Sequence, residues 1–112
     1  DDAALLEELK RYDGTPTEVL DHPELMELFL PVIRADFELL ETWAPTQGEP
    51  VDIPVTAYGG EEDHRAEPAM LEAWGEQTTA AFEMKLFPGG HFYLNTHQDI
   101  FMAAFKQALE DT

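Results

Sequence analysis

Residues 53–63 read IPVTAYGGEED and residues 82–91 read FEMKLFPGGH. Each stretch opens with a short apolar run typical of a strand and continues into two glycines, which permit a sharp turn. A helical pattern separates the two runs, so we expect strands at 53–58 and 82–87 to lie parallel in a βαβ unit. Functional side chains lie just beyond the carboxyl ends of such strands. Asp63 and His91 stand at those two positions in the sequence.

Asp63 and His91 are the candidate catalytic pair. The acid precedes the histidine, which is the order of the last two members of an α/β-hydrolase triad. A carboxylate that accepts the imidazole Nδ1–H fixes the tautomer and stabilises the imidazolium. Glu61 and Glu62 are rival acids, and an Asp after two glycines is also typical of a turn or a helix cap. The nucleophile is missing, because the 112 residues contain no Ser.

A metal site is the weaker interpretation of the same region. Asp63, His64 and His91 are metal-ligand types, but they lack the H-x-x-x-H or H-E-x-x-H spacing of metal-binding motifs. We therefore expect no metal. Among the other histidines, we expect His97 to be an exposed residue in the first turn of the last helix.

The composition limits the partners and the compartment. The formal charge of −18 disfavours nucleic acids and anionic membranes, which would repel the chain. An apolar content of 44% argues for a globular chain rather than a disordered one. There is no Cys, which excludes disulfides and thiolate metal sites and fits a reducing compartment, so we expect a cytoplasmic protein. No apolar run is long enough for a membrane span.

The N-terminal part of the sequence has the pattern of three helices. The first ends near residues 12–13, and the second covers roughly residues 16–21 after a capping box formed by Thr15 and Glu18. A longer helix runs over residues 23–42, and Pro31 should kink or break it. Its apolar face is wider than one stripe, so it either packs a core or lines a channel for an apolar substrate.

The C-terminal part predicts two more helices. The first begins at Pro68 and should bury Met70, Leu71 and Trp74. The last is capped by Asn95 and should turn one apolar face to the sheet, formed by Leu94, Phe101, Phe105 and Leu109. Two strands leave both sheet edges open, so we expect further strands from residues outside this sequence or from another chain. The absence of an initial Met also suggests that the chain is part of a larger protein.

Several motifs resemble one family in the same order along the chain. They are GTPTEVL at 14–20, PELMEL at 23–28, LPVIRADF at 30–37, PVTAYGGEED at 54–63 and FPGGHFYL at 87–94. The sequence is similar in these motifs to type II thioesterases, the stand-alone editing enzymes of polyketide and nonribosomal peptide synthesis. The similarity extends from residue 5 to about residue 105.

The resemblance implies the C-terminal part of an α/β-hydrolase fold. Residues 1–43 would form a helical lid region, and residues 44–112 the C-terminal part of the core of a single domain whose N-terminal half is absent. Asp63 and His91 would be catalytic, while Met26, Phe29 and Phe37 of the lid would bind the acyl group. The nucleophilic Ser and the oxyanion hole would belong to the absent half.

The implied reaction is hydrolysis of an acyl thioester on the phosphopantetheine arm of an acyl or peptidyl carrier protein. No cofactor is needed, and neither nucleic acid nor membrane is an expected partner. Two other classes stay open: a different serine α/β-hydrolase such as an esterase, and a non-catalytic helical interaction domain. A G-x-S-x-G elbow upstream of the sequence would separate enzyme from binding domain.

Overall fold

The computed structural model describes residues 1–12 and 14–112, which form two compact units, Asp1–Gly48 and Glu49–Thr112. The predicted end of the first helix falls at residues 12–13; the helix reaches Tyr12, and residue 13 lies outside the described residues.

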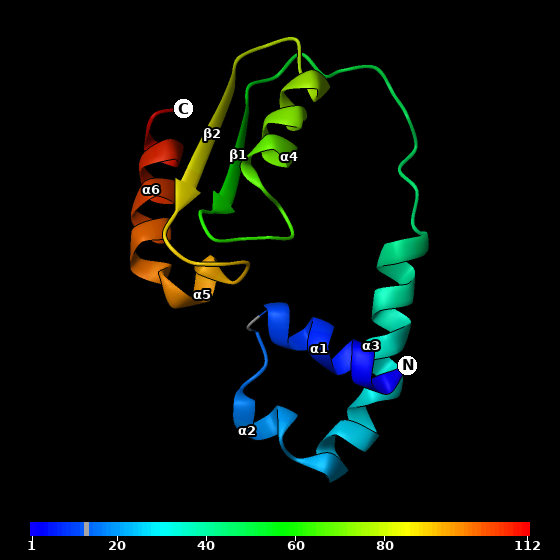
Figure 1. The fold of residues 1–112 in the computed structure, drawn as a ribbon. Helices are drawn as coiled ribbons and strands as arrows, with labels where there is room; N and C mark the ends of the chain where they lie inside the picture. The colour runs from blue at the N-terminus through cyan, green and yellow to red at the C-terminus, as the bar shows by residue number, and fades with distance from the viewer. Residues whose placement is uncertain (13) are drawn as a thin grey trace. The chain divides into compact units, whose positions relative to one another are not determined.

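The first unit is helical, with α1 (Asp2–Tyr12), α2 (Thr17–Leu20) and α3 (Pro23–Thr42) (Figure 1). The rings of Tyr12 and Phe37 lie 5.7 Å apart between centroids, and Arg34 pairs with Asp2, so both ends of α1 contact α3. Only Leu9 and Met26 are buried among the described apolar side chains of this unit.

Two expected features of these helices are corrected. The α3 helix continues through Pro31, so the break that was one of the two expected outcomes does not occur; an interior proline can kink a helix without ending it. The predicted capping box is also wrong: Pro16 occupies the N-cap of α2, and no side chain caps that helix. A side-chain cap does form at α3, where His22 Nδ1 accepts from the Leu25 N–H at 3.3 Å.

The second unit contains a two-stranded sheet, β1 (Val55–Gly60) and β2 (Phe82–Phe87). The strands are parallel, as predicted, with Val55 opposite Phe82 and Gly60 opposite Phe87. The β1 strand begins two residues later than predicted, because Pro54 has no N–H to donate and the first bond into the ladder comes from Val55, to the carbonyl of Ala81 at 3.0 Å.

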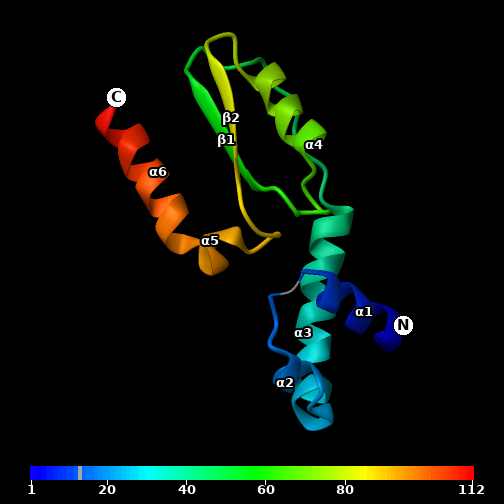
Figure 2. The same cartoon turned by 60° about the vertical axis from the view of Figure 1, so that its left-hand side comes forward.

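Helices lie on both sides of the strand pair. The crossover contains α4 (Pro68–Glu72) and the short 3₁₀ helix η1 (Ala73–Gln77), and α5 (Tyr93–Thr96) and α6 (Gln98–Glu110) follow β2. Figures 1 and 2 show α4 on one side of the strands and α6 on the other. The side chain of Leu71 from α4 packs against Gly59, where the missing Cβ leaves room for it.

An aromatic cluster fills the space between β2 and the last helices. Phe87 stacks on Tyr93 with ring centroids 5.5 Å apart and meets Phe101 edge-on at 5.5 Å. Phe101 also contacts Tyr58 at 5.6 Å and stacks on Phe105 at 5.8 Å. The cluster anchors the end of β2, directly before the Pro-Gly-Gly turn.

Part of the predicted burial is wrong. Phe101 faces the strands as expected, but Leu94, Phe105 and Leu109 are exposed. Leu71 is buried, whereas Met70 and Trp74 are exposed. Met70 is the neighbour of Leu71 on α4 and points about 100° away around the helix. Trp74 lies in the tighter 3₁₀ turn after Glu72, which changes the helical spacing.

The predicted cap of the last helix is also wrong. Asn95 lies inside the short helix α5, and His97 occupies the N-cap of α6. Within the part of the chain that the structure describes, no helix has the length and apolarity needed to cross a membrane.

Candidate active site

The loops after β1 and β2 are tied together by their backbones. The N–H of Glu61 donates to the carbonyl of Phe87 at 2.8 Å, and the N–H of Glu62 donates to the carbonyl of Gly89 at 2.9 Å. The parallel ladder therefore continues beyond β1, and the two loops leave the sheet in a fixed relation to each other.

Asp63 and His91 meet at this edge of the sheet. The His91 Nδ1 atom lies 2.9 Å from Asp63 Oδ2, which confirms the predicted contact. A carboxylate only accepts hydrogen bonds, so Nδ1 is the protonated ring nitrogen and donates to Asp63. The Asp63 side chain is 4% exposed and that of His91 is 41% exposed. The acid is thus buried behind a histidine that reaches the surface.

The second carboxylate oxygen holds Asp63 in position. Oδ1 accepts from the N–H of Arg65 at 2.8 Å and from the N–H of Ala66 at 3.2 Å. Burial raises the pKa of Asp63, but the Arg65 N–H, the hydrogen bond and positive charge of His91, and the Ala66 N–H outweigh burial and lower the pKa below 3.8. Asp63 is therefore ionised at neutral pH.

This arrangement suits proton transfer. With the proton of the neutral ring held on Nδ1 by Asp63, Nε2 is the basic nitrogen of His91. An ionised carboxylate behind the ring stabilises the imidazolium that forms when Nε2 takes a proton. The pair therefore has the geometry of a general base and its orienting acid.

The rival groups lie outside this pair. Glu61 and Glu62 are exposed, and the carboxylate that contacts His91 Nδ1 is that of Asp63. Across residues 1–12 and 14–112, no group of three or more His, Asp or Glu side chains is arranged to hold a metal ion.

The predicted acyl-binding residues lie in the first unit, all on α3. Met26 is 4% exposed and Phe29 is 46% exposed, while Phe37 is half-buried against Tyr12. Asp63 and His91 belong to the second unit.

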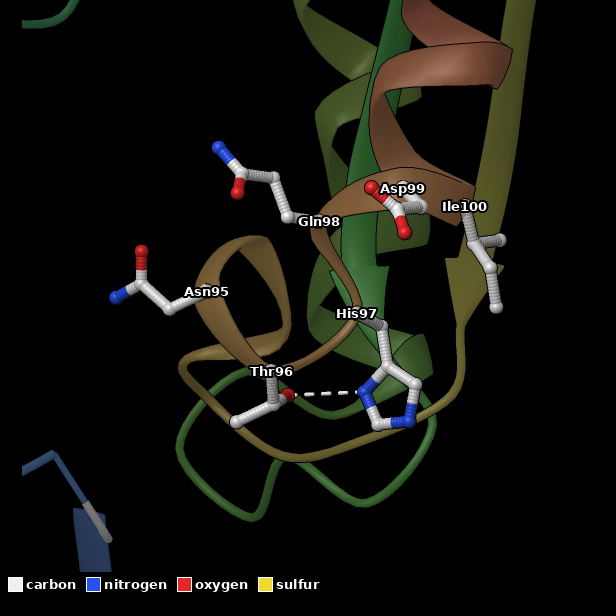
Figure 3. Close-up of a pocket in the computed structure, with 6 residues that line it drawn as sticks. All are labelled: Asn95, Thr96, His97, Gln98, Asp99 and Ile100. Carbon is white, nitrogen blue, oxygen red and sulfur yellow. Dashed lines mark hydrogen bonds between the residues drawn. The ribbon is translucent and has the colours of Figure 1, made fainter.

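His97 was expected to be an exposed residue in the first turn of the last helix, and the structure places it differently. It is half-buried, and its Nδ1 lies 2.9 Å from the Thr96 hydroxyl in a pocket at the start of α6 (Figure 3). A Cβ at Gly89 would lie 2.8 Å from that nitrogen, so the ring packs on the turn before His91. The sequence signal for this contact is weak. It consists of a tight Pro-Gly-Gly turn and the N-cap position of a helix eight residues after Gly89.

The family model and the curated relatives of this chain point to the same family. The model of the Thioesterase domain family matches residues 1–109. Gramicidin S biosynthesis protein GrsT of Aneurinibacillus migulanus is 40% identical over 93 residues, which are 83% of this chain and 36% of that protein.

Solved structures agree with this match. The type II thioesterase BorB from the borrelidin biosynthetic cluster superposes with a TM-score of 0.74 at 34% identity, covering 96% of this chain and 44% of BorB. ClbQ from the colibactin NRPS/PKS pathway gives a TM-score of 0.82 at 28% identity, covering 99% of this chain and 47% of ClbQ. The α/β-hydrolase fold expected from the sequence is thereby confirmed, and the chain spans less than half the length of each of these proteins.

Proposed function

The chain belongs to the thioesterase domain family, and on that premise we propose that it supplies the acid and the general base of a serine hydrolase. The substrate is an acyl thioester on the phosphopantetheine arm of a carrier protein in nonribosomal peptide or polyketide synthesis. The observation that carries the proposal is the 2.9 Å contact between His91 and Asp63 beyond the ends of two parallel strands.

His91 moves the proton in each half of the proposed reaction. A serine hydroxyl attacks the thioester carbonyl while Nε2 of His91 takes the hydroxyl proton. The tetrahedral intermediate collapses, the C–S bond breaks, and His91 returns the proton to the leaving thiolate. His91 then deprotonates the water that attacks the acyl-serine ester, and the proton returns to the serine as the acid leaves. Asp63 keeps the ring in the productive tautomer throughout.

The nucleophile comes from outside these residues in this proposal. The sequence contains no Ser, and no Thr stands in a G-x-T-x-G elbow. Together with the open edges of β1 and β2, this supports an N-terminal half that supplies further strands, the serine and the oxyanion hole. No cofactor takes part.

Residues 1–43 act as a helical lid in this proposal, and residues 44–112 as the C-terminal part of the core. Met26, Phe29 and Phe37 of α3 line the acyl channel. The support is an apolar surface on and just after α3 that stays exposed within its own unit, formed by Leu28, Phe29, Val32, Leu39, Leu40 and Trp43.

The charge of the chain constrains docking of the carrier protein. Carrier proteins are usually acidic, and the formal charge of −18 would repel an acidic partner. Docking therefore depends on the apolar lid surface or on the N-terminal half. The same charge argues against nucleic acids and membranes as partners.

The test compares thioesters with oxygen esters. The full-length protein is assayed with short acyl groups on a phosphopantetheinylated carrier protein and with p-nitrophenyl esters of the same acids. We expect faster hydrolysis of the thioesters, and a loss of about 10⁴-fold in turnover for His91→Gln. The matched control is His64→Gln, which changes an exposed histidine one residue after Asp63 and should keep the activity.

Two results would refute the proposal. Preferential hydrolysis of the oxygen esters would identify an esterase instead. Binding of the carrier protein without turnover of either substrate would identify an interaction domain.

A further inference from the structure

The turn that presents His91 contains one backbone conformation that depends on glycine. Gly89 has φ +106°, which L side chains rarely adopt. Its carbonyl accepts the N–H of Glu62 at 2.9 Å, and the carbonyl of Gly90 accepts the N–H of Tyr93 at 3.1 Å. One side of the turn is thus bonded to the acid loop, and its end is bonded to α5.

The side chains of His97 and Thr96 pack against Gly89. A Cβ there would meet His97 Nδ1 at 2.8 Å, His97 Cε1 at 3.1 Å and the Thr96 hydroxyl at 3.1 Å. The imidazole and the hydroxyl therefore occupy the space where a side chain of residue 89 would lie. Because Gly89 is held between these groups and the acid loop, the turn has little room to shift.

The His97 ring is itself held in place. Its Nδ1 lies 2.9 Å from the Thr96 hydroxyl, as the dashed line in Figure 3 marks. Its backbone N–H donates to Tyr93 at 2.9 Å, and its carbonyl accepts from Phe101 at 3.1 Å, so the backbone of His97 joins α5 to α6. Tyr93 and Phe101 both belong to the aromatic cluster, with ring centroids 5.9 Å apart, so the backbone of His97 is joined to that cluster.

We propose that His97 is a positioning residue for His91. Its ring, oriented by Thr96, holds the Gly89 turn in the conformation that directs His91 Nδ1 at Asp63. His91 follows Gly89 by two residues, so a small rotation of the turn would move the imidazole out of line with the carboxylate. The catalytic part of this inference rests on the proposed function; the geometric part does not.

The test uses the full-length protein and three variants. His97→Ala removes the ring, His97→Asn keeps a side-chain amide close to the place of Nδ1 that can donate or accept a hydrogen bond, and Thr96→Val removes the hydroxyl while keeping its volume. Gln98→Ala is the matched control, because Gln98 lines the same pocket and is exposed. Thermal melts verify that each variant is folded.

The direct readout is the NMR signal of the His91 Nδ1 proton, assigned by its loss in His91→Gln. We expect this proton to exchange with water faster in His97→Ala and Thr96→Val, and at the wild-type rate in His97→Asn and Gln98→Ala. In hydrolysis assays, His97→Ala should lower kcat roughly tenfold to a hundredfold with little change in KM, because a displaced base slows chemistry without weakening substrate binding.

The exchange rates and kcat values of these variants decide whether His97 positions His91. Unchanged exchange and kcat in His97→Ala would overturn the inference, as would an equal loss in His97→Asn. If His97→Ala fails to fold, Thr96→Val decides alone. If the wild-type protein hydrolyses no acyl thioester, the proposed function fails, and the exchange of the His91 proton still decides whether His97 holds the turn.

Discussion

The backbone of Gly60 lies directly against the carbonyl of Gly90. A Cβ at position 60 would lie 2.6 Å from the Gly89 oxygen and closer still to the Gly90 oxygen. Both neighbours are backbone atoms, so they move only if the whole turn moves. The last residue of β1 therefore sets how closely the acid loop and the histidine turn approach each other.

We predict that Gly60→Ala separates His91 from Asp63. The added methyl would push the Gly89–Gly90 turn away from the acid loop, and kcat of the full-length protein should fall roughly tenfold to a hundredfold. The measurement is steady-state hydrolysis of an acyl-carrier thioester. Gly48→Ala is the control, because a Cβ there meets nothing within 4 Å. Wild-type kcat in Gly60→Ala would show that the turn adapts without cost.

We predict that losses at Asp63 and His91 are not additive. The two groups act through one hydrogen bond, so Asp63→Asn in the His91→Gln background should change turnover far less than it does alone. Turnover of the two single variants and of the double variant in the same assay gives the interaction energy. Independent, multiplying losses would mean that Asp63 acts other than through His91.

The sequence predicted the site better than the packing around it. Asp63 and His91 were found because parallel strands bring their carboxyl ends to one edge, a rule of topology that needs no side-chain detail. The exposure of Trp74 was not predictable, because it depends on where α4 tightens into a 3₁₀ turn. The position of His97 was missed for a similar reason, since His97 is the break between α5 and α6, which a single helical pattern cannot represent.

Because Asp63 is ionised in the folded chain, we predict that the protein loses stability at acid pH. Its pKa is below 3.8 in the folded chain, so the unfolded state binds its proton more readily. The stabilisation is complete above the unfolded pKa, begins to fall below about pH 5 and is lost as the pH drops through the lowered folded pKa. Denaturant midpoints from pH 7 to pH 3 should fall less steeply for Asp63→Asn than for wild type. Asp36→Asn, on an exposed part of α3, controls for the loss of one negative charge.

Two proposed acyl-binding residues should respond differently to truncation. Met26 is 4% exposed, so Met26→Ala should destabilise the protein by about 2 kcal/mol or more through the cavity it leaves. Phe29 is 46% exposed, so Phe29→Ala should change stability by less than about 1 kcal/mol. If Phe29 lines the acyl channel, kcat/KM should shift among acetyl, butyryl and hexanoyl thioesters in Phe29→Ala. An unchanged order of preference would remove Phe29 from the channel.

Residues 1–112 produced alone should have no thioesterase activity. The sequence has no Ser to attack the carbonyl, and His91 can only transfer the proton of a nucleophile that another segment provides. The isolated chain should also melt without a sharp transition, because a two-stranded sheet with open edges is marginal by itself. Circular dichroism melts and acyl-thioester assays of the isolated chain, compared with those of the full-length protein, measure both properties.

Co-expression with an N-terminal segment that carries further strands and a G-x-S-x-G elbow should restore the sharp melt and the turnover together. Turnover by the 112 residues alone, abolished by His91→Gln, would show that the dyad works without a serine and would replace the serine mechanism by direct attack of a water that His91 deprotonates.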